Sequence, residues 1–326
     1  MATYSGKQFE AYVGIATQNI GSEVVAGTLY KMRMPSVNDI DFSGGVQLED
    51  VERTGQRVLR PTDHIAVRGG GTYSWSFSDY VIENKAMLQL LLQLVTEDTS
   101  PSVSASMTGN QATVAYAEGA ATGEYANIVI SSPDTDKDRL MHSAILQDLT
   151  LSLDPSAHGG RLTASGTFWS GFQPDIDTEA SSANATAVDY TKGFFDCTTQ
   201  TLASNAVYMN KFDITISNPA TRAGFKTVNS NAGEPESYNR GGQISVTGNV
   251  GVKMDDNSVT MVDNFLAGTS TNVSIGDGST IDFDIPTAKI SGHELDLGNE
   301  SGAFINLPFL GTADGSGVLV TIIGTT

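Results

Sequence analysis

The chain has 326 residues, and its 18 Lys and Arg against 37 Asp and Glu give a formal net charge of −19. At roughly 100–200 residues per domain, this length predicts about two domains, and the 39% hydrophobic content is enough for a packed core. The acidic balance excludes a broad basic face that grips nucleic acid, and the single cysteine, Cys197, excludes an internal disulfide and a Cys-based zinc site.

The N-terminal residues 1–21 show no cationic stretch followed by an apolar one, so we expect no secretory signal. The longest dense apolar run, residues 87–95, is far shorter than the roughly 20 residues that span a bilayer. We therefore expect a protein without a membrane segment.

Alternation of apolar and polar residues predicts mostly short strands with one buried face. The cleanest case spans residues 72–78, where Tyr73, Trp75 and Phe77 share one face and Ser and Thr share the other. Clusters of Gly, Asn, Asp and Ser separate such runs, as hairpin connections require. Further strands are predicted at residues 149–153, 212–216, 244–246, 281–285 and 318–323.

Helix signals are few. The first covers residues 78–95, capped by Ser78 or Asp79, and its apolar residues occupy most of the circumference, which predicts packing on more than one side. The second covers residues 258–267, with Ser258 as its cap and Gly268 after its end.

The order of these signals repeats, which indicates an internal duplication. The segment at residues 29–35 has a counterpart at 207–212, and Leu151-Ser152-Leu153 has one in Leu295-Asp296-Leu297. We expect two tandem β-sandwich or barrel-like domains, each with a flanking helix and a long interface loop. The alternative is two unrelated β-rich domains with similar strand patterns. The predicted boundaries are residues 1–190, a linker at 191–204, and residues 205–326, with an insertion of about 35 residues within 99–140.

No motif predicts catalysis, a metal site or a cofactor. The phosphate-loop and nucleophile-elbow patterns are absent, and the glycines at 69–71 run into a strand, as in a turn. Asp134, Asp136 and Asp138 have calcium-loop spacing but lack the following glycine, and Ile145 stands where the loop needs glutamate. The four histidines are scattered without metal-ligand spacing.

Two long polar segments, residues 36–63 and 217–242, are candidate interfaces, because loops of this length usually serve a function. Apolar residues spread among charges in the first would need a partner surface. The alternative is a hairpin folded onto its own domain. If the first segment is an arm, deleting residues 39–60 should leave a folded subunit that cannot polymerise. The interface candidates are Ile40, Phe42, Val46, Leu48, Arg53, Arg57, Arg60, Phe225, Glu234, Glu236 and Arg240.

Each half runs from a strand through a long loop to a Gly-containing strand (HIAVRGGGTYSWSF; QISVTGNVGVKM), a helix (ENKAMLQLLLQLV; SVTMVDNFLAG) and a hairpin. The chain closes with TAKISGHELDLGNESGAFINLPFLGTADGSGVLVTIIGTT. This architecture resembles the tail tube (major tail) protein of long non-contractile-tailed bacteriophages, over residues 28–175 and 205–326. The resemblance implies a non-enzymatic virion protein, assembled in the host cytoplasm, whose β-sandwich domains form stacked rings.

With two tube domains in one chain, the resemblance implies a trimeric, pseudo-hexameric ring, the alternative being a hexameric ring. The implied partners are other copies, a tape-measure protein, tail terminator and tip proteins, and DNA that passes through the lumen without sequence-specific binding. Excess carboxylates would repel DNA and let it slide. The lumen candidates are Asp213, Asp282 and Asp284. The competing hypothesis is a tandem β-sandwich adhesion module of a tail tip or cell surface.

Overall fold

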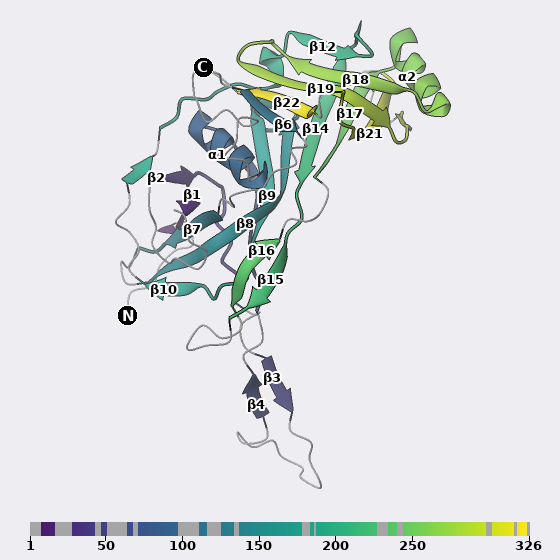
Figure 1. Cartoon of the computed structure of the whole chain (residues 1–326). Coiled ribbons are helices and arrows are strands. Elements are labelled where there is room, and N and C mark those ends of the chain that lie inside the picture. The colour runs from purple at the N-terminus through teal and green to yellow at the C-terminus, as the bar shows by residue number, and fades with distance from the viewer. Residues whose placement is uncertain are drawn as a thin grey trace.

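The structure is a computed structural model that describes residues 8–16, 28–42, 47–50, 64–67, 71–96, 111–115, 125–133, 137–177, 183–185, 187–226, 234–239, 244–297, 302–315 and 318–324. The predicted mainly β fold class is confirmed (Figure 1).

The first part of the chain folds into the following elements: β1 (Glu10–Ala16), β2 (Thr28–Met32), β3 (Gln47–Asp50), β4 (His64–Val67), β5 (Tyr73–Val81), α1 (Lys85–Thr96), β6 (Gln111–Ala115), β7 (Tyr125–Ser131), β8 (Asp138–Leu153), β9 (Leu162–Ser170), β10 (Asp175–Asp177) and β11 (Ala183–Ala185). The second part contains β12 (Thr199–Leu202), β13 (Asn205–Ala206), β14 (Met209–Ser217), β15 (Thr221–Phe225), β16 (Pro235–Asn239), β17 (Ser245–Lys253), α2 (Asp256–Ala267), β18 (Ser270–Gly276), β19 (Ile281–Ile290), β20 (Glu294–Asp296), β21 (Phe304–Gly311) and β22 (Val318–Gly324).

Both helices begin elsewhere than predicted. The expected cap residues Ser78 and Asp79 lie in β5, because the strand continues past a bulge to bury Tyr80 opposite Ala164. Helix α1 is instead capped by Asn84, whose Oδ1 accepts the amides of Ala86 at 2.8 Å and Met87 at 3.2 Å.

Helix α2 is capped by Asp255, and the predicted cap Ser258 is the third residue of a capping box. The Ser258 amide donates to Asp255 at 2.9 Å, and the Ser258 hydroxyl accepts the Asp255 amide at 2.8 Å. The predicted helix end is confirmed, since Gly268 follows the helix with φ 64°.

The two halves pair their strands in the same order. In the first, β5 pairs with β9, β9 with β8, β8 with β7, and β7 with β1. In the second, β17 pairs with β21, β21 with β19, β19 with β18, and β18 with β12. Strand β12 lies within the segment predicted as a linker, and the predicted insertion supplies β6 and β7.

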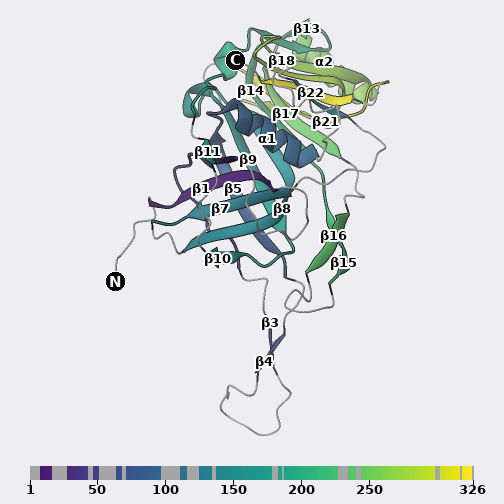
Figure 2. The ribbon, with the colours of Figure 1, turned by 60° about the vertical axis from the view of Figure 1, so that its left-hand side comes forward.

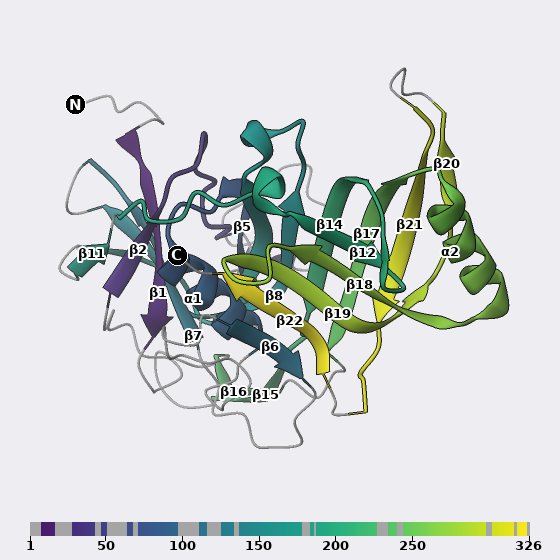
Figure 3. The ribbon, with the colours of Figure 1, turned by 90° about the horizontal axis from the view of Figure 1, so that it is seen from above.

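The halves also share one sheet, because β14 pairs antiparallel with the C-terminal part of β8. The register runs from Phe212 opposite Leu153 to Ser217 opposite Asp148. The result is a continuous order β5-β9-β8-β14-β17-β21, of which Figure 1 labels the strands from β9 to β21. A second link forms where β22, near the end of the chain, pairs with β6 of the first half (Figure 3).

Helix α1 fills the core at the meeting point of the halves. It contacts β8, β1, β22 and β6, and Figure 2 shows it beside β8 and β22. Burying each of its leucines contributes about 1.5–3 kcal/mol. The Asn218 side chain, just after β14, donates to the last-turn carbonyl of Val95 at 2.9 Å. The predicted packing of this helix on several sides is confirmed by its buried residues Met87, Leu88, Leu90, Leu91, Leu92, Leu94 and Val95.

Because the halves share a sheet and a core, we expect them to unfold in one cooperative transition. Replacing Leu151 by Ala, at a fully buried position beside β14, should lower the free energy of unfolding by about 2–5 kcal/mol and shift the whole transition. Circular dichroism and calorimetry over a thermal scan would check this. Two separate transitions, with only one moved by the substitution, would contradict it.

Candidate assembly and channel surfaces

The shared sheet has one apolar face and one polar face. On β8, Leu149, Leu151 and Leu153 are buried in the core, while the intervening Thr150 and Ser152 point the other way. The register carries this alternation across neighbouring strands, and none of these polar residues is buried. We call this surface the hydroxyl face; its members are Ser76, Thr163, Ser165, Thr167, Asp148, Thr150, Ser152, Asp213, Thr215, Ser217, Ser245, Thr247 and Asn249.

Direct side-chain contacts tie the hydroxyl face together across strands. The hydroxyls of Thr150 and Thr215 lie 2.8 Å apart across the junction of the halves, and those of Ser76 and Thr167 lie 3.0 Å apart. The charged side chains here include the carboxylates of Asp148 and Asp213 and the ammonium group of Lys211, which lies two positions before Asp213 on the same side of β14 and 3.6 Å from its carboxylate. The face is therefore polar but carries few charges for its width.

The three predicted lumen carboxylates lie on two different strands. Asp213 belongs to the hydroxyl face, where burial raises its pKa and Lys211, 3.6 Å away, partly offsets the rise. Asp282 and Asp284 lie on β19, where it pairs with β18 and β22. Burial, reinforced by Asp284 and Asp277, raises the pKa of Asp282 to about 6.

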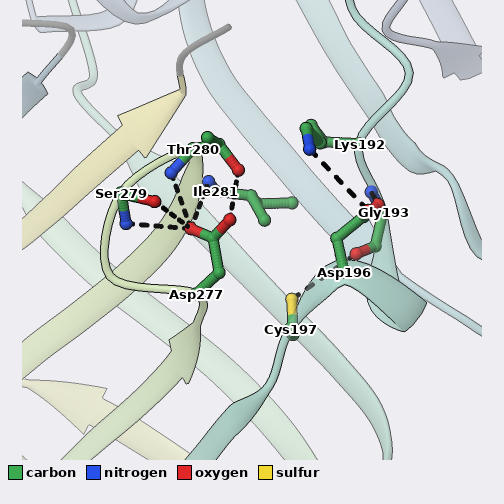
Figure 4. A network of polar contacts seen from close by, with 8 residues as sticks. All are labelled: Lys192, Gly193, Asp196, Cys197, Asp277, Ser279, Thr280 and Ile281. Carbon is green, nitrogen blue, oxygen red and sulfur yellow. Dashed lines mark hydrogen bonds and ion pairs between the residues drawn. The ribbon is translucent and has the colours of Figure 1, made fainter.

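A polar network in the β18–β19 turn lies near a second group of polar contacts in the segment before β12 (Figure 4). Asp277 Oδ1 accepts the amides of Ser279 at 2.8 Å, Thr280 at 2.6 Å and Ile281 at 3.1 Å. Burial opposes its ionisation, but a hydrogen bond from the Thr280 hydroxyl and these amides outweigh burial and hold the pKa of Asp277 below its usual range. The network closes the hairpin turn.

Cys197 lies beside this network as a buried thiol that donates to the Gly193 carbonyl at 3.5 Å (Figure 4). Burial, with Asp196, Asp277 and Asp282 nearby, raises the pKa of the Cys197 thiol to about 12. The sulfur is thus a packing group at neutral pH.

The first long segment contains a hairpin, β3–β4, that projects away from the body of the protein (Figure 1). Leu48 lies on β3, whereas Val46, Arg53, Arg57 and Arg60 lie outside the described residues. Ile40 and Phe42 belong to residues 38–42, which we call the root of the segment, rather than to the projecting hairpin. Ile40 is buried, and Phe42 packs on the core beneath Arg139.

The root is fixed to β5. The Asp41 amide donates to Ser74 at 3.0 Å, and the indole of Trp75 donates to the Asn38 carbonyl at 3.0 Å. A deletion that begins at residue 39 would therefore remove core packing as well as the hairpin. This corrects the expectation that deleting residues 39–60 affects assembly alone.

The second long segment forms the hairpin β15–β16, which packs back onto the first half. Tyr238 accepts the Gly171 amide at 2.9 Å, its ring lies 5.1 Å from that of Trp169, and Arg222 donates to Gly71 and Thr72. The predicted candidates lie at its other positions: Phe225 and Glu236 are exposed, Glu234 pairs with Lys226 at 3.8 Å, and Arg240 lies outside the described residues.

Sequence reasoning missed Arg222 and Tyr238, since nothing local to either residue indicates a partner about 70–150 positions away. It also missed the hydroxyl face, although the Ser and Thr alternating with the core residues in β5, β8 and β9 were a visible signal.

Side chains that commonly bind metal ions do not gather in the described part of the chain. The described residues contain no group of three or more His, Cys, Asp or Glu that could hold a metal ion. Of the three aspartates that are spaced as in a calcium loop, Asp138 is buried and accepts the Ser132 amide at 2.6 Å. Asp134 and Asp136 fall outside the described ranges. Among the described helices, none has the length and apolar character needed to cross a membrane.

Comparison with known proteins gives one informative match. The family model described as phage tail tube protein matches residues 18–312. No curated protein matches the chain.

We predict that a thiol reagent labels Cys197 slowly in the native protein at pH 8 and rapidly after denaturation, because both burial and the raised pKa protect the sulfur. The absorbance of released thionitrobenzoate measures both rates. Equal rates in the two states would contradict the buried position.

Asp282 should make the folded state less stable as pH rises. Its folded pKa of about 6 lies above its ordinary value of 3.8, so its stabilising effect is full below pH 4 and is lost as pH rises through 6. Asp282→Asn should raise the free energy of unfolding at pH 8 by on the order of 1 kcal/mol, after allowance for solvent screening. Urea unfolding at pH 4 and pH 8 measures this.

The matched control is Asp263→Asn, which removes an exposed carboxylate from α2. It should leave stability unchanged at both pH values. If Asp282→Asn behaves as the control does, Asp282 does not sit in the environment described above.

Proposed function

Because the chain belongs to the phage tail tube protein family, we propose that three copies close into a ring of six quasi-equivalent domains, and that rings stack into a hollow tube that conducts DNA. As a member of this family the protein is a structural component of the virion tail. The proposed domains are residues 1–190 and 205–326, and assembly would take place in the host cytoplasm.

The observation that carries the proposal is the hydroxyl face, which continues across both halves through the β8–β14 ladder. A channel for DNA must avoid strong phosphate contacts, since each Lys or Arg contact adds affinity. Hydroxyl groups with occasional carboxylates, and with Lys211 paired to Asp213, give a wetted wall that holds phosphate weakly. We therefore assign Asp148 and Asp213 to the channel wall, and Asp282 and Asp284 to a surface outside it.

The trimeric ring is supported by the strand pairing, which has the same order in both halves. Two similar domains side by side in one chain supply one third of a pseudo-sixfold ring. Contacts between chains would then resemble the contact between the halves of one chain. A ring of six separate chains would instead need only one such domain in each.

Stacking is assigned to the β3–β4 hairpin, which projects from the body and would reach the neighbouring ring. The β15–β16 hairpin packs on its own chain. Through its contacts with Gly171 and Gly71 of the first half, it would stabilise the region from which the β3–β4 hairpin projects. In the complete tail, tape-measure, terminator and tip proteins would contact the tube, and the protein itself would have no catalytic role.

Negative-stain electron microscopy of the purified protein tests the proposal. We expect rings with a central hole, and tubes at higher protein concentration. Isolated two-lobed particles at every concentration would contradict it and favour the alternative adhesion module.

A hairpin replacement tests the stacking assignment. Replacing residues 44–69 by a short Gly-Ser linker keeps Ile40 and Phe42 in place and should leave the thermal midpoint nearly unchanged. The variant should form rings that do not stack. The control, Phe225→Ala on the exposed side of β15–β16, should stack normally. Full-length tubes from the replacement variant would refute this assignment.

A further inference from the structure

A pair of leucines is buried where the two halves meet, and the corresponding pair at the far edge of the second half is exposed. Leu151 and Leu153 of β8 are 0% exposed. The matching pair, Leu295 and Leu297, lies at β20 and is 46% and 71% exposed. The exposed pair thus presents apolar surface where its counterpart is covered.

The two leucine pairs occupy equivalent places in their sheets. Leu151 lies opposite Ala164 of β9, and Leu295 lies opposite Ile305 of β21. Strands β9 and β21 in turn pair with β5 and β17, the strands that precede the helices. The difference in exposure therefore comes from what lies beside β8 on the side away from β9, and beside β20 on the side away from β21.

On the outer side of β8 lies β14, with Ile214 opposite Leu151 and Phe212 opposite Leu153. On the outer side of β20 no strand pairs within the described part of the chain, where β20 pairs only with β21. A strand equivalent to β14 would complete this edge.

The first half contains such a segment at residues 38–42. It runs along β5 through the Asp41–Ser74 bridge, as β14 runs along β17. Ile40 points into the core of the first half with 2% exposure, as Ile214 does in the second with 0%. Ile214 lies on a strand that pairs on both sides, whereas residues 38–42 form no strand pairing on the side away from β5 among the described residues.

We infer that a second copy of this chain places its residues 38–42 antiparallel along β20, with Ile40 opposite Leu295 and Asp41 opposite Glu294. This contact repeats between copies the β8–β14 contact within one chain, and it rests on the proposed ring. It covers Leu295 and Leu297 and extends the hydroxyl face from one copy to the next.

The same register places the carboxylates of Asp41 and Glu294 opposite each other, and both residues are exposed in the single chain. Like charges that face each other across a strand pair oppose association, and salt screens them.

Disulfide trapping tests the register. Opposed residues of an antiparallel pair have Cα atoms about 4.5–5.5 Å apart, which suits a disulfide. The double variant Asp41→Cys, Glu294→Cys should, under oxidation, lose its monomer band on a non-reducing gel and form covalent species that end at the closed trimer. The native Cys197 is buried and should not interfere.

The controls are the two single variants and the mismatched pair Asp41→Cys, Asp263→Cys, whose second site is exposed on α2. None of these should form species larger than a dimer. If the Asp41, Glu294 variant assembles into rings or tubes but stays monomeric on the gel, the inference is wrong and the proposed function stands. If the wild-type chain forms no rings and the variant forms no cross-link, both are wrong.

A second variant tests the inference independently, in case the double cysteine variant fails to assemble. Leu297→Asp changes a side chain that is 71% exposed, so the chain should fold with an unchanged thermal midpoint. It should lose ring formation, seen as a monomer by light scattering under conditions in which the wild type forms rings. Normal rings from this variant would overturn the inference.

Discussion

The antiparallel ladder between β8 and β14 is the contact on which the rest of the structure depends. It aligns the two halves in one sheet, buries Leu151 and Leu153 on one side, and brings the hydroxyls of Thr150 and Thr215 within 2.8 Å on the other. It also leads the chain to Asn218, which binds the last turn of α1. Without this ladder the polar surfaces of the halves would not be continuous across β8 and β14.

The two halves use similar elements in different environments. Helix α1 is buried between sheets of both halves, whereas α2 buries few side chains and lies at the outer end of the second half (Figure 3). The β3–β4 hairpin projects, and the β15–β16 hairpin packs on its own chain. In the proposed ring these differences follow from position: the first half has a covalent neighbour beside β8, and the second half needs another copy beside β20.

Most strands could be predicted because alternation records burial locally. Tyr73, Trp75 and Phe77 are buried as the pattern indicates. The start of α1 could not be placed this way, because Tyr80 is held by a strand partner distant in sequence, and only then does Asn84 become the cap.

The site was predicted less well than the fold. Ile40 and Phe42 looked like residues of a free arm because polar neighbours surround them, yet β5 holds them at its root. Nor could sequence separate Asp213 from Asp282 and Asp284, since all three alternate with apolar residues and only the strand pairing shows that Asp213 lies beside β17 and Asp282 and Asp284 lie beside β18. The repeated Leu-x-Leu pair was visible in the sequence, but its two contrasting exposures were not.

The central claim is that the hydroxyl face lines the channel. A cryo-electron microscopy reconstruction of the assembled tube, at a resolution that traces side chains, tests it most directly. The claim predicts that Thr150, Ser152, Asp213 and Thr215 point into the lumen of every ring, in a wall that is continuous between copies. A map that places these four residues on the outer surface of the tube, with β19 and its Asp282 and Asp284 toward the axis, would contradict it.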